Sequence, residues 1–347
     1  MSGERSERPQ PVPPSGRMSA EAVSEMLRRG QAVTDEVRER AIYLAARGQM
    51  LRQVDHPTQP RVIGAAIMTG LRPDIRHPFF AEVLEGIRER AVASHCDLLL
   101  FSGHVSGDFV EEFSYVARCR RHIIEGVILM GFARNDPELE HLLAEEIPTV
   151  AVDLDLVGAR ASYVMSDNVE AAATVVQYLH ALGYARIAHL AGIPASRPGT
   201  DRILGYRSGL EHEQLPFNKE YLVEGDLYEP SGYAGMERLL ALKQRPEVVF
   251  CASDMMALGA IRAAHVAGLR VPDDIAVVGF DDDSFADMME PALTTVRQDK
   301  PGLGAAACEA LIRIVDEAAS GPPVVVLPTE LVIRESCGAA IRAGRKR

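Results

Sequence analysis

Residues 248–282 read VVFCASDMMALGAIRAAHVAGLRVPDDIAVVGFDD. A short apolar run, VVFCA, is followed by a stretch whose apolar residues recur at helical spacing, and a second apolar run, IAVVGF, comes after it. Two strands joined by one helix form a parallel pair with a right-handed crossover. This stretch therefore predicts a strand–helix–strand unit.

The same alternation extends over most of the chain beyond Arg61. Amphipathic segments such as FFAEVLEGIRERAVAS and NVEAAATVVQYLHALG lie between the apolar runs. The other runs are VIGAAIM, CDLLLF, GVILM, PTVAVD and ARIAHLAG. Strands that alternate with helices predict an α/β fold in which helices cover both faces of parallel sheets.

The number of units favours two lobes around a cleft over one sheet, because a single core stops growing near about 250 residues. A closed (β/α)₈ barrel is the competing interpretation, since it shows the same alternation. The tail, with PALTTVRQ, a helix expected over 302–320 and the strand VVVLPTELVI, is typical of segments that cross between lobes. We expect an N-lobe at 61–161 and 293–321, a C-lobe at 162–292 and 322–340, and a basic tail at 341–347.

Composition limits the class of protein. The chain has 347 residues, 47% of them hydrophobic and 25% charged, as in soluble globular proteins. No apolar run approaches the ~20 residues that span a bilayer, and the N-terminus lacks a secretory signal, so we predict a cytoplasmic protein without membrane contact. The five cysteines have no metal-ligand spacing and are expected to be free buried thiols. The net charge of −12 disfavours coating of nucleic acid over the whole surface, but it allows a small DNA-reading module.

Three carboxylates, Asp281, Asp282 and Asp283, follow directly after the last apolar run. They could hold a metal ion, take part in acid/base chemistry, bind a ligand rich in hydroxyls, or form a solvated turn. The D-x-D-x-D-G spacing of a calcium loop is absent. Ligands of open α/β sheets bind at the carboxyl ends of strands. We therefore expect Asp281 to face a ligand and its two neighbours to be turn residues.

Motifs of catalysis and of cofactor binding are not found in the sequence. There is no G-x-G-x-x-G after a strand, no Walker loop, no H-E-x-x-H and no G-x-S-x-G. The ten histidines form no metal or base pair by spacing. The sequence therefore predicts a binding protein that is not an enzyme and needs no cofactor or metal.

Ten segments in order, over about residues 61–336, resemble the lactose-repressor family of bacterial transcription regulators. They include HPFFAEVLEGI, LGYARIAHLAG, DRILGYRSGL, VEGDLYEPSGY and the stretch at 248–282. The resemblance implies a periplasmic-binding-protein-like core, a homodimer, operator DNA as partner and a small, carbohydrate-like effector in the cleft. It implies effector contacts at these positions: Phe79, Asp153, Arg202, Ser253 and Asp281.

Some positions depart from the family pattern. Ser253 stands where asparagine is usual, which shortens the reach of the side chain. Leu227 stands where some sugar-binding members have tryptophan, and the chain has no Trp at all. Stacking against a sugar ring is therefore left to Phe79, Phe132 or Tyr228, or does not occur.

The N-terminal residues match the family less well. We expect a proline-rich tail at 1–17, a degenerate helix-turn-helix segment at 18–50 and a linker at 51–60. Residues 1–60 contain nine arginines, no lysine and eight acids, a net charge of +1. DNA-binding modules are usually clearly basic, because phosphate contacts supply much of the affinity. The candidate DNA contacts are Ser19, Val23, Ser24, Arg28 and Arg29.

Two functions are consistent with these patterns. The first is an effector-responsive regulator, expected to be a repressor, in which the effector changes the spacing of two DNA-reading heads. The second is a sensor or interaction protein that has lost autonomous DNA binding. In either case we expect Asp281→Ala and Arg202→Ala to abolish effector binding and leave the fold intact, because both positions lie at ends of elements.

Overall fold

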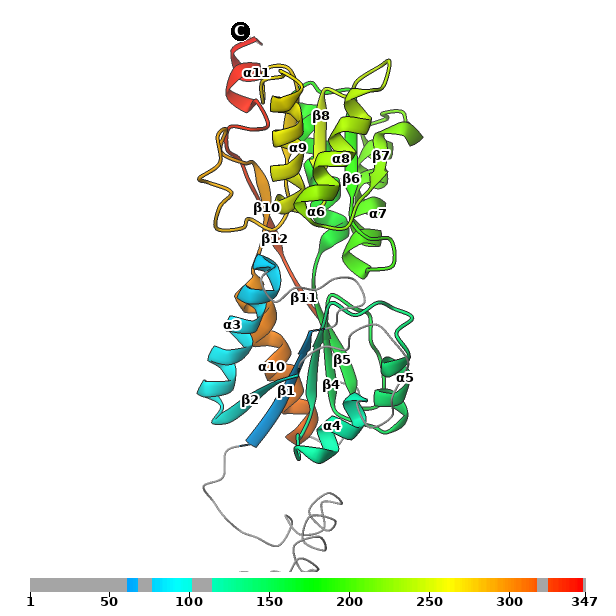
Figure 1. Cartoon of the computed structure of the whole chain (residues 1–347), viewed down its shortest axis with the longest axis vertical. Helices are drawn as coiled ribbons and strands as arrows, with labels where there is room; N and C mark the ends of the chain where they lie inside the picture. Colours follow the sequence, from blue (N-terminus) through cyan, green and yellow to red (C-terminus); the bar gives the residue numbers. More distant parts are fainter. Residues whose placement is uncertain (1–60, 68–76, 102–113, 317–323, 346–347) are drawn as a thin grey trace, which may run out of the picture. The chain divides into compact units, whose positions relative to one another are not determined.

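Two parallel sheets organise the residues that the computed structural model describes, which are 61–67, 77–101, 114–316 and 324–345. We refer to the elements around the first sheet as the N-lobe and to those around the second as the C-lobe (Figure 1). Apart from Arg120–Ile123, the described residues belong to one compact unit.

The N-lobe sheet has six strands in the order β11-β5-β4-β3-β1-β2, and every neighbouring pair is parallel. Its strands are β1 (Arg61–Ile67), β2 (Cys96–Phe101), β3 (Val127–Met130), β4 (Thr149–Val152), β5 (Ala161–Ser166) and β11 (Val325–Leu327). Because both faces are covered by helices, strands such as β3 and β4 are buried along their whole length and are almost entirely apolar.

Alternate side chains of these strands enter two separate cores. On β3, Ile128 and Met130 pack with α3 (Pro78–Ala93) and α10 (Lys300–Asp316), whereas Val127 and Leu129 pack with α4 (Tyr115–Arg121) and α5 (Pro137–Ala144). Figure 1 shows α3 and α10 side by side on one face of the sheet. Successive strand residues point to opposite faces, so one apolar run serves both layers.

The C-lobe repeats the design with four parallel strands in the order β7-β6-β8-β9. Helices α6 and α7 pack together on one core, and α8 and α9 pack on the other. The bounds are α6 (Asn168–Ala181), β6 (Ile187–Ala191), α7 (Arg197–His212), η3 (Lys219–Tyr221), β7 (Leu222–Glu224), α8 (Glu229–Leu240), β8 (Val248–Cys251), α9 (Asp254–Val266), β9 (Ala276–Val278) and α11 (Ala339–Arg345).

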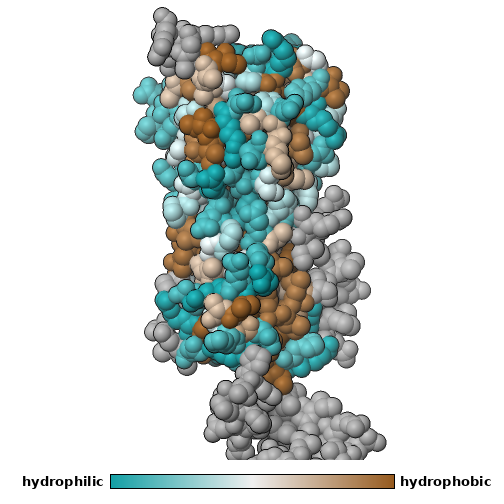
Figure 2. Space-filling view, turned by 90° about the vertical axis from the view of Figure 1, so that its left-hand side faces the viewer, coloured by the Kyte–Doolittle hydropathy of each residue, from teal (hydrophilic) through white to brown (hydrophobic). Residues whose placement is uncertain are grey.

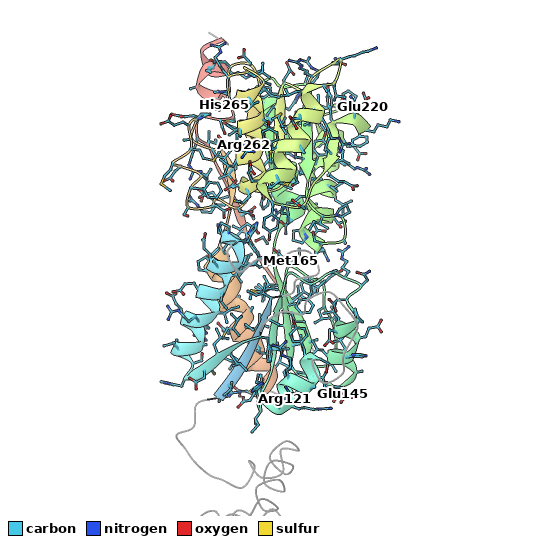
Figure 3. The ribbon with its side chains drawn as sticks, viewed as in Figure 1. Arg121, Glu145, Met165, Glu220, Arg262 and His265 are labelled. Carbon is cyan, nitrogen blue, oxygen red and sulfur yellow. The ribbon has the colours of Figure 1, made fainter. Side chains whose placement is uncertain are left out.

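Within the residues that the structure describes, the chain passes between the lobes at three places. It leaves β5 at Ser166 for α6, returns from β10 (Thr295–Gln298) into α10, and passes from β11 through Pro328 into β12 (Thr329–Val332). Strands β10 and β12 form an antiparallel ribbon at the second and third crossings. Met165, labelled in Figure 3, lies on β5 just before the first crossing.

The prediction of two parallel-sheet lobes is confirmed, and the described strands form open sheets rather than a closed barrel. The predicted lobe boundaries differ from the structure at three strands. Residues 295–298 were expected in the N-lobe, but Val296 of β10 packs in the C-lobe core. Residues 162–166 and 325–327 were expected in the C-lobe, but β5 and β11 pair with each other in the N-lobe sheet. The expected final strand is divided at Pro328, because proline cannot donate a hydrogen bond to a ladder.

The predicted N-terminal tail, helix-turn-helix segment and linker lie outside the described residues, as does the end of the helix expected over 302–320. Among the residues that the structure describes, no helix combines the length and the apolar character needed to cross a membrane.

Candidate functional site

A cavity of about 80 Å³ lies where strand ends of the two sheets meet. A cavity needs only ~10–15 Å³ of such volume to hold one water molecule, so this cavity can admit part of a small molecule. The N-lobe contributes His77, Phe79, Phe80, Gly131, Phe132, Val152 and Asp153, and the C-lobe contributes Ile193, Ser196, Pro198, Arg202, Asp226, Leu227, Tyr228 and Asp281. Most of these residues follow the carboxyl end of a strand, where ligands of open α/β sheets bind.

Arg202 is the buried cation of this cavity. It lies on α7 and is only 3% exposed. Its Nε donates to Oδ1 of Asn168 at 2.9 Å, a guanidinium N–H donates to the carbonyl of Ala252, and its planar group lies 3.7 Å from the ring centre of Phe280. These contacts fix the guanidinium in one orientation, which is what recognition of a ligand requires.

Asp281 faces Arg202 across the same space. Its Oδ1 accepts from Nε2 of Gln298 at 2.7 Å and lies 3.7 Å from an Arg202 nitrogen. Its φ of 116° is outside the range that L-residues normally adopt. Such strain persists where the surroundings hold a residue in place, and it often occurs at binding sites. Burial raises the pKa of Asp281, although Arg202 favours its charged form.

Asp153 directly follows β4 with a left-handed φ of 55° and also lines the cavity. Its Oδ1 is buried and has no hydrogen-bond partner in the described structure. Burial raises the pKa of this carboxyl to about 6, and the nearby Arg202 opposes the shift. Buried polar atoms without partners are uncommon in folded proteins, so this oxygen is available for a ligand.

Aromatic and aliphatic side chains form the rest of the wall. Phe79 and Phe80 meet edge to face with ring centres 5.4 Å apart. The rings considered above for stacking, Phe79, Phe132 and Tyr228, all line the cavity, and Leu227 lies beside Tyr228. The cavity therefore offers apolar surface for the face of a ring and a few polar groups for its edge.

Four of the five expected effector contacts, Phe79, Asp153, Arg202 and Asp281, lie in the cavity wall. The fifth, Ser253, is 1% exposed and does not line the cavity. Its Oγ donates to the Leu227 carbonyl at 2.8 Å and accepts from Met256 N at 3.1 Å, which caps α9. The serine side chain, shorter than the asparagine usual at this position, thus connects the Leu227 carbonyl to the first turn of α9.

The expectation that Asp282 and Asp283 form a solvated turn is wrong. Asp282 accepts hydrogen bonds at 2.7 Å from both Arg297 and Arg334. Asp283 is 2% exposed, and its Oδ1 lies 2.9 Å from Nζ of Lys300. Arg297 lies on β10, Arg334 follows β12, and Lys300 begins α10. Both carboxylates therefore connect the loop after β9 to segments through which the chain crosses between the lobes.

His77 and Phe80 also line the cavity, although the resemblance to the family did not mark them as effector contacts. His77 is 7% exposed and caps α3 through Nδ1, which accepts from Phe79 N at 3.3 Å. The signal that could have found it is its position directly before the first helix that follows a strand. The candidate DNA contacts Ser19, Val23, Ser24, Arg28 and Arg29 lie outside the described residues.

Two parallel-sheet lobes that enclose a polar and aromatic cavity define a binding protein of the periplasmic-binding-protein type. In agreement, residues 176–337 match the family model of the periplasmic binding protein-like domain. The chain is 35% identical over 263 residues to the HTH-type transcriptional repressor PurR of Pectobacterium carotovorum, covering 75% of this chain and 76% of that protein. It is 32% identical over 270 residues to the probable repressor ExuR of Bacillus subtilis, covering 77% and 78%.

Solved structures give the same result. A LacI regulator from Bacillus cereus subsp. cytotoxis superposes with a TM-score of 0.72 at 27% identity, over 80% of this chain and 99% of that one. The regulator CelR in complex with cellobiose superposes with a TM-score of 0.69 at 26% identity, over 92% of this chain and 100% of that one. The chain belongs to the LacI family of transcriptional regulators.

Proposed function

We propose that this protein is a homodimeric, cytoplasmic repressor that binds operator DNA through its N-terminal segment and a small, sugar-like effector in the cavity between its lobes. The observation that carries the proposal is the cavity itself, in which Asp153, Arg202 and Asp281 converge beside aromatic rings. A carboxylate that can accept from hydroxyls, next to a ring that can stack on an apolar face, suits a carbohydrate. The groups have no arrangement of nucleophile and base, which supports binding rather than catalysis.

We expect effector binding to affect DNA binding through the segments in which the chain crosses between the lobes. Asp281 lines the cavity and accepts from Gln298, the last residue of β10 before the chain enters the N-lobe. An effector that contacts both lobes binds some lobe arrangements more tightly than others, and that difference in affinity is what shifts the population. Repositioning of the N-lobes would then alter the spacing of two DNA-reading heads.

Exposed apolar side chains support a dimer. Val92 on α3 is 63% exposed and Val266 on α9 is 72% exposed, and Leu100 on the edge strand β2 is also exposed. Figure 2, which views the chain from the side of α3, shows apolar patches on both lobes. Figure 3 shows Arg262 and His265 on α9, so this helix presents polar as well as apolar groups. A second copy of the chain would cover such mixed surface.

The dimer is tested by sedimentation of the full chain and of Leu100→Lys and Val266→Lys. We expect both variants to shift toward monomer, whereas Val157→Lys, at a similarly exposed valine between β4 and β5, retains the dimer. A monomeric wild-type chain would contradict the dimer.

DNA binding is tested with the DNA upstream of the gene for this protein, as a salt series by fluorescence anisotropy. We expect specific binding that weakens steeply with salt, because lysine and arginine release counterions from phosphates. The alternative, a sensor without autonomous DNA binding, predicts a folded dimer that binds small molecules and no specific DNA. That result would overturn the proposed repressor.

A further inference from the structure

A second cavity, of about 770 Å³, lies in the C-lobe and has no part in the proposed function. Residues 242–247 and 272–274 form its wall together with Tyr184, Arg186 and the start of α11, and we call it the distal cavity. Its volume lies within the range of small-molecule sites, about 300–1,000 Å³.

The distal cavity lies at the edge of the C-lobe sheet where strands begin. Arg186 stands directly before β6, Glu247 directly before β8, and residues 272–274 shortly before β9. These three strands are parallel neighbours, so their first residues share one edge of the sheet. The cavity between the lobes is lined by residues that follow strand ends, and the distal cavity is therefore a separate site at the opposite edge.

The carboxylates in the wall of the distal cavity are paired within the protein. Oε2 of Glu247 accepts from two backbone N–H groups at 3.0 and 3.1 Å, and its Oε1 lies 3.5 Å from an Arg186 nitrogen. Arg270, which is not a wall residue, lies 3.1 Å from Asp273 and 3.1 Å from Asp274. Hydrogen bonds from Arg270 lower the pKa of Asp274, so this carboxylate is satisfied as an anion.

Three basic side chains of the wall lack such partners. No carboxylate that the structure describes pairs with Lys243, Arg245 or Arg342. The guanidinium carbon of Arg342 lies 3.5 Å from the ring centre of Tyr184, and this stacking leaves N–H donors along the edge of the planar group. The chain as a whole carries a net charge of −12, so the distal cavity is a local excess of positive charge.

The kind of cation indicates the kind of anion. A guanidinium group matches phosphate oxygens with two parallel hydrogen bonds, and an ammonium group binds phosphate as a point charge. One phosphate group carries only about −1.5 to −2 charges near neutral pH, which is too little to balance three cations.

We propose that the distal cavity binds a small molecule with two or more phosphate groups, held by Lys243, Arg245 and Arg342. Such a ligand connects the loop 242–247 to α11, because Arg342 is on that helix. The proposal rests neither on the effector cavity nor on DNA binding, since none of its residues belongs to either site.

The ligand class is tested by calorimetry of the full chain at physiological salt with inorganic phosphate, pyrophosphate, tripolyphosphate and citrate. We expect pyrophosphate and tripolyphosphate to bind at one site per chain, and inorganic phosphate to bind more weakly than either. Citrate has several charges but no phosphate, so it should also bind more weakly. Absence of binding by both pyrophosphate and tripolyphosphate, or citrate binding as tightly as they do, would overturn the proposal.

The position of the site is tested with Arg245→Gln and Arg342→Gln, measured with tripolyphosphate. We expect each variant to bind about 10-fold more weakly, because hydrogen bonds to charged groups contribute about 1.5–3 kcal/mol and every 1.4 kcal/mol is about tenfold in affinity. Arg245 is exposed, so its replacement leaves the fold intact even if Arg342→Gln is destabilised by loss of the Tyr184 contact. Arg238→Gln on α8 makes the same change of charge at an exposed position outside the wall, and it should bind like the wild type.

Phosphate probes could also bind to the arginines of the N-terminal segment. In that case Arg245→Gln and Arg342→Gln would bind tripolyphosphate as tightly as the wild type, and the proposal would be wrong.

Discussion

Nζ of Lys300 lies 2.9 Å from Oδ1 of Asp283, and both side chains are buried. The same ammonium group lies 3.0 Å from Glu82 on α3. Lys300 therefore joins the loop that carries Asp281 to the helix that begins at the cavity wall. Burial lowers the pKa of Lys300, but the neighbouring carboxylates outweigh it and raise the pKa overall.

The first prediction concerns Lys300→Met, which leaves Asp283 buried without its cation. Removal of one partner of a buried pair typically costs about 3–5 kcal/mol, so we expect a loss of this order in the free energy of unfolding. Burial already raises the pKa of Asp283 to about 6, and loss of Lys300 raises it further. A carboxyl group with a raised folded pKa destabilises the protein as pH rises through that pKa, so urea unfolding should show a larger loss at pH 8 than at pH 5.

The double variant Lys300→Met with Asp283→Asn serves as its control, because it removes the unpaired charge. We expect it to be more stable than Lys300→Met alone at pH 8. If the single variant unfolds like the wild type at both pH values, the pair does not contribute to stability.

The second prediction corrects the expectation that Arg202→Ala leaves the fold intact. Arg202 lies in the interior rather than at an exposed helix end, and it bonds to Asn168 and to the Ala252 carbonyl. Its loss removes from the buried Asp281 the cation that most favours its charged form, so we expect the unfolding free energy to fall by about 3–5 kcal/mol. Thermal and urea unfolding measure this change.

Arg207→Ala, at an exposed position of the same helix, is its control and should change stability little. Asp281→Asn, which keeps the size of the side chain, is the better probe of effector binding. A stable Arg202→Ala protein would restore the original expectation.

The sequence predicted the parts of the fold and of the site that depend on local patterns. Apolar runs and helical spacing are local, and the strand ends carry Asp153 and Asp281 into one cavity by the topology of parallel sheets. Ser253, Asp282 and Asp283 were misjudged because their partners are 26, 52 and 17 residues away, at Leu227, Arg334 and Lys300. No local pattern identifies such partners.

The third prediction concerns the contact between α3 and α10. A Cβ atom on Gly86 would lie 2.0 Å from the Pro301 carbonyl oxygen, and one on Gly304 would lie 2.0 Å from the Val83 carbonyl oxygen. The two helices approach this closely only because both positions are glycine. Gly86→Ala should lower the unfolding free energy by about 1–3 kcal/mol despite the better helix propensity of alanine. Glu89→Ala, on the exposed side of α3, is the matched variant and should not destabilise the protein.

The last prediction is that the buried carboxylate of Asp153 lowers the unfolding free energy of the wild-type protein near neutral pH and contributes to ligand binding. Burial raises its pKa from 3.8 to about 6, so the folded state binds more protons than the unfolded state between these values. Its contribution to stability is fully present below pH 3.8 and is lost as pH rises through about 6. Asparagine carries no such charge and tolerates the left-handed φ of this position.

Urea unfolding should therefore find Asp153→Asn more stable than the wild type by up to about 3 kcal/mol at pH 8, with little difference near pH 4. The same variant should bind the effector more weakly, because a carboxylate accepts hydrogen bonds more strongly than an amide. Asp155→Asn, two residues along and paired with Arg134 and Arg197, should show no gain at pH 8. Equal stability of Asp153→Asn and wild type at pH 8 would mean that the Asp153 carboxylate does not destabilise the folded protein, so no ligand is needed to offset its burial.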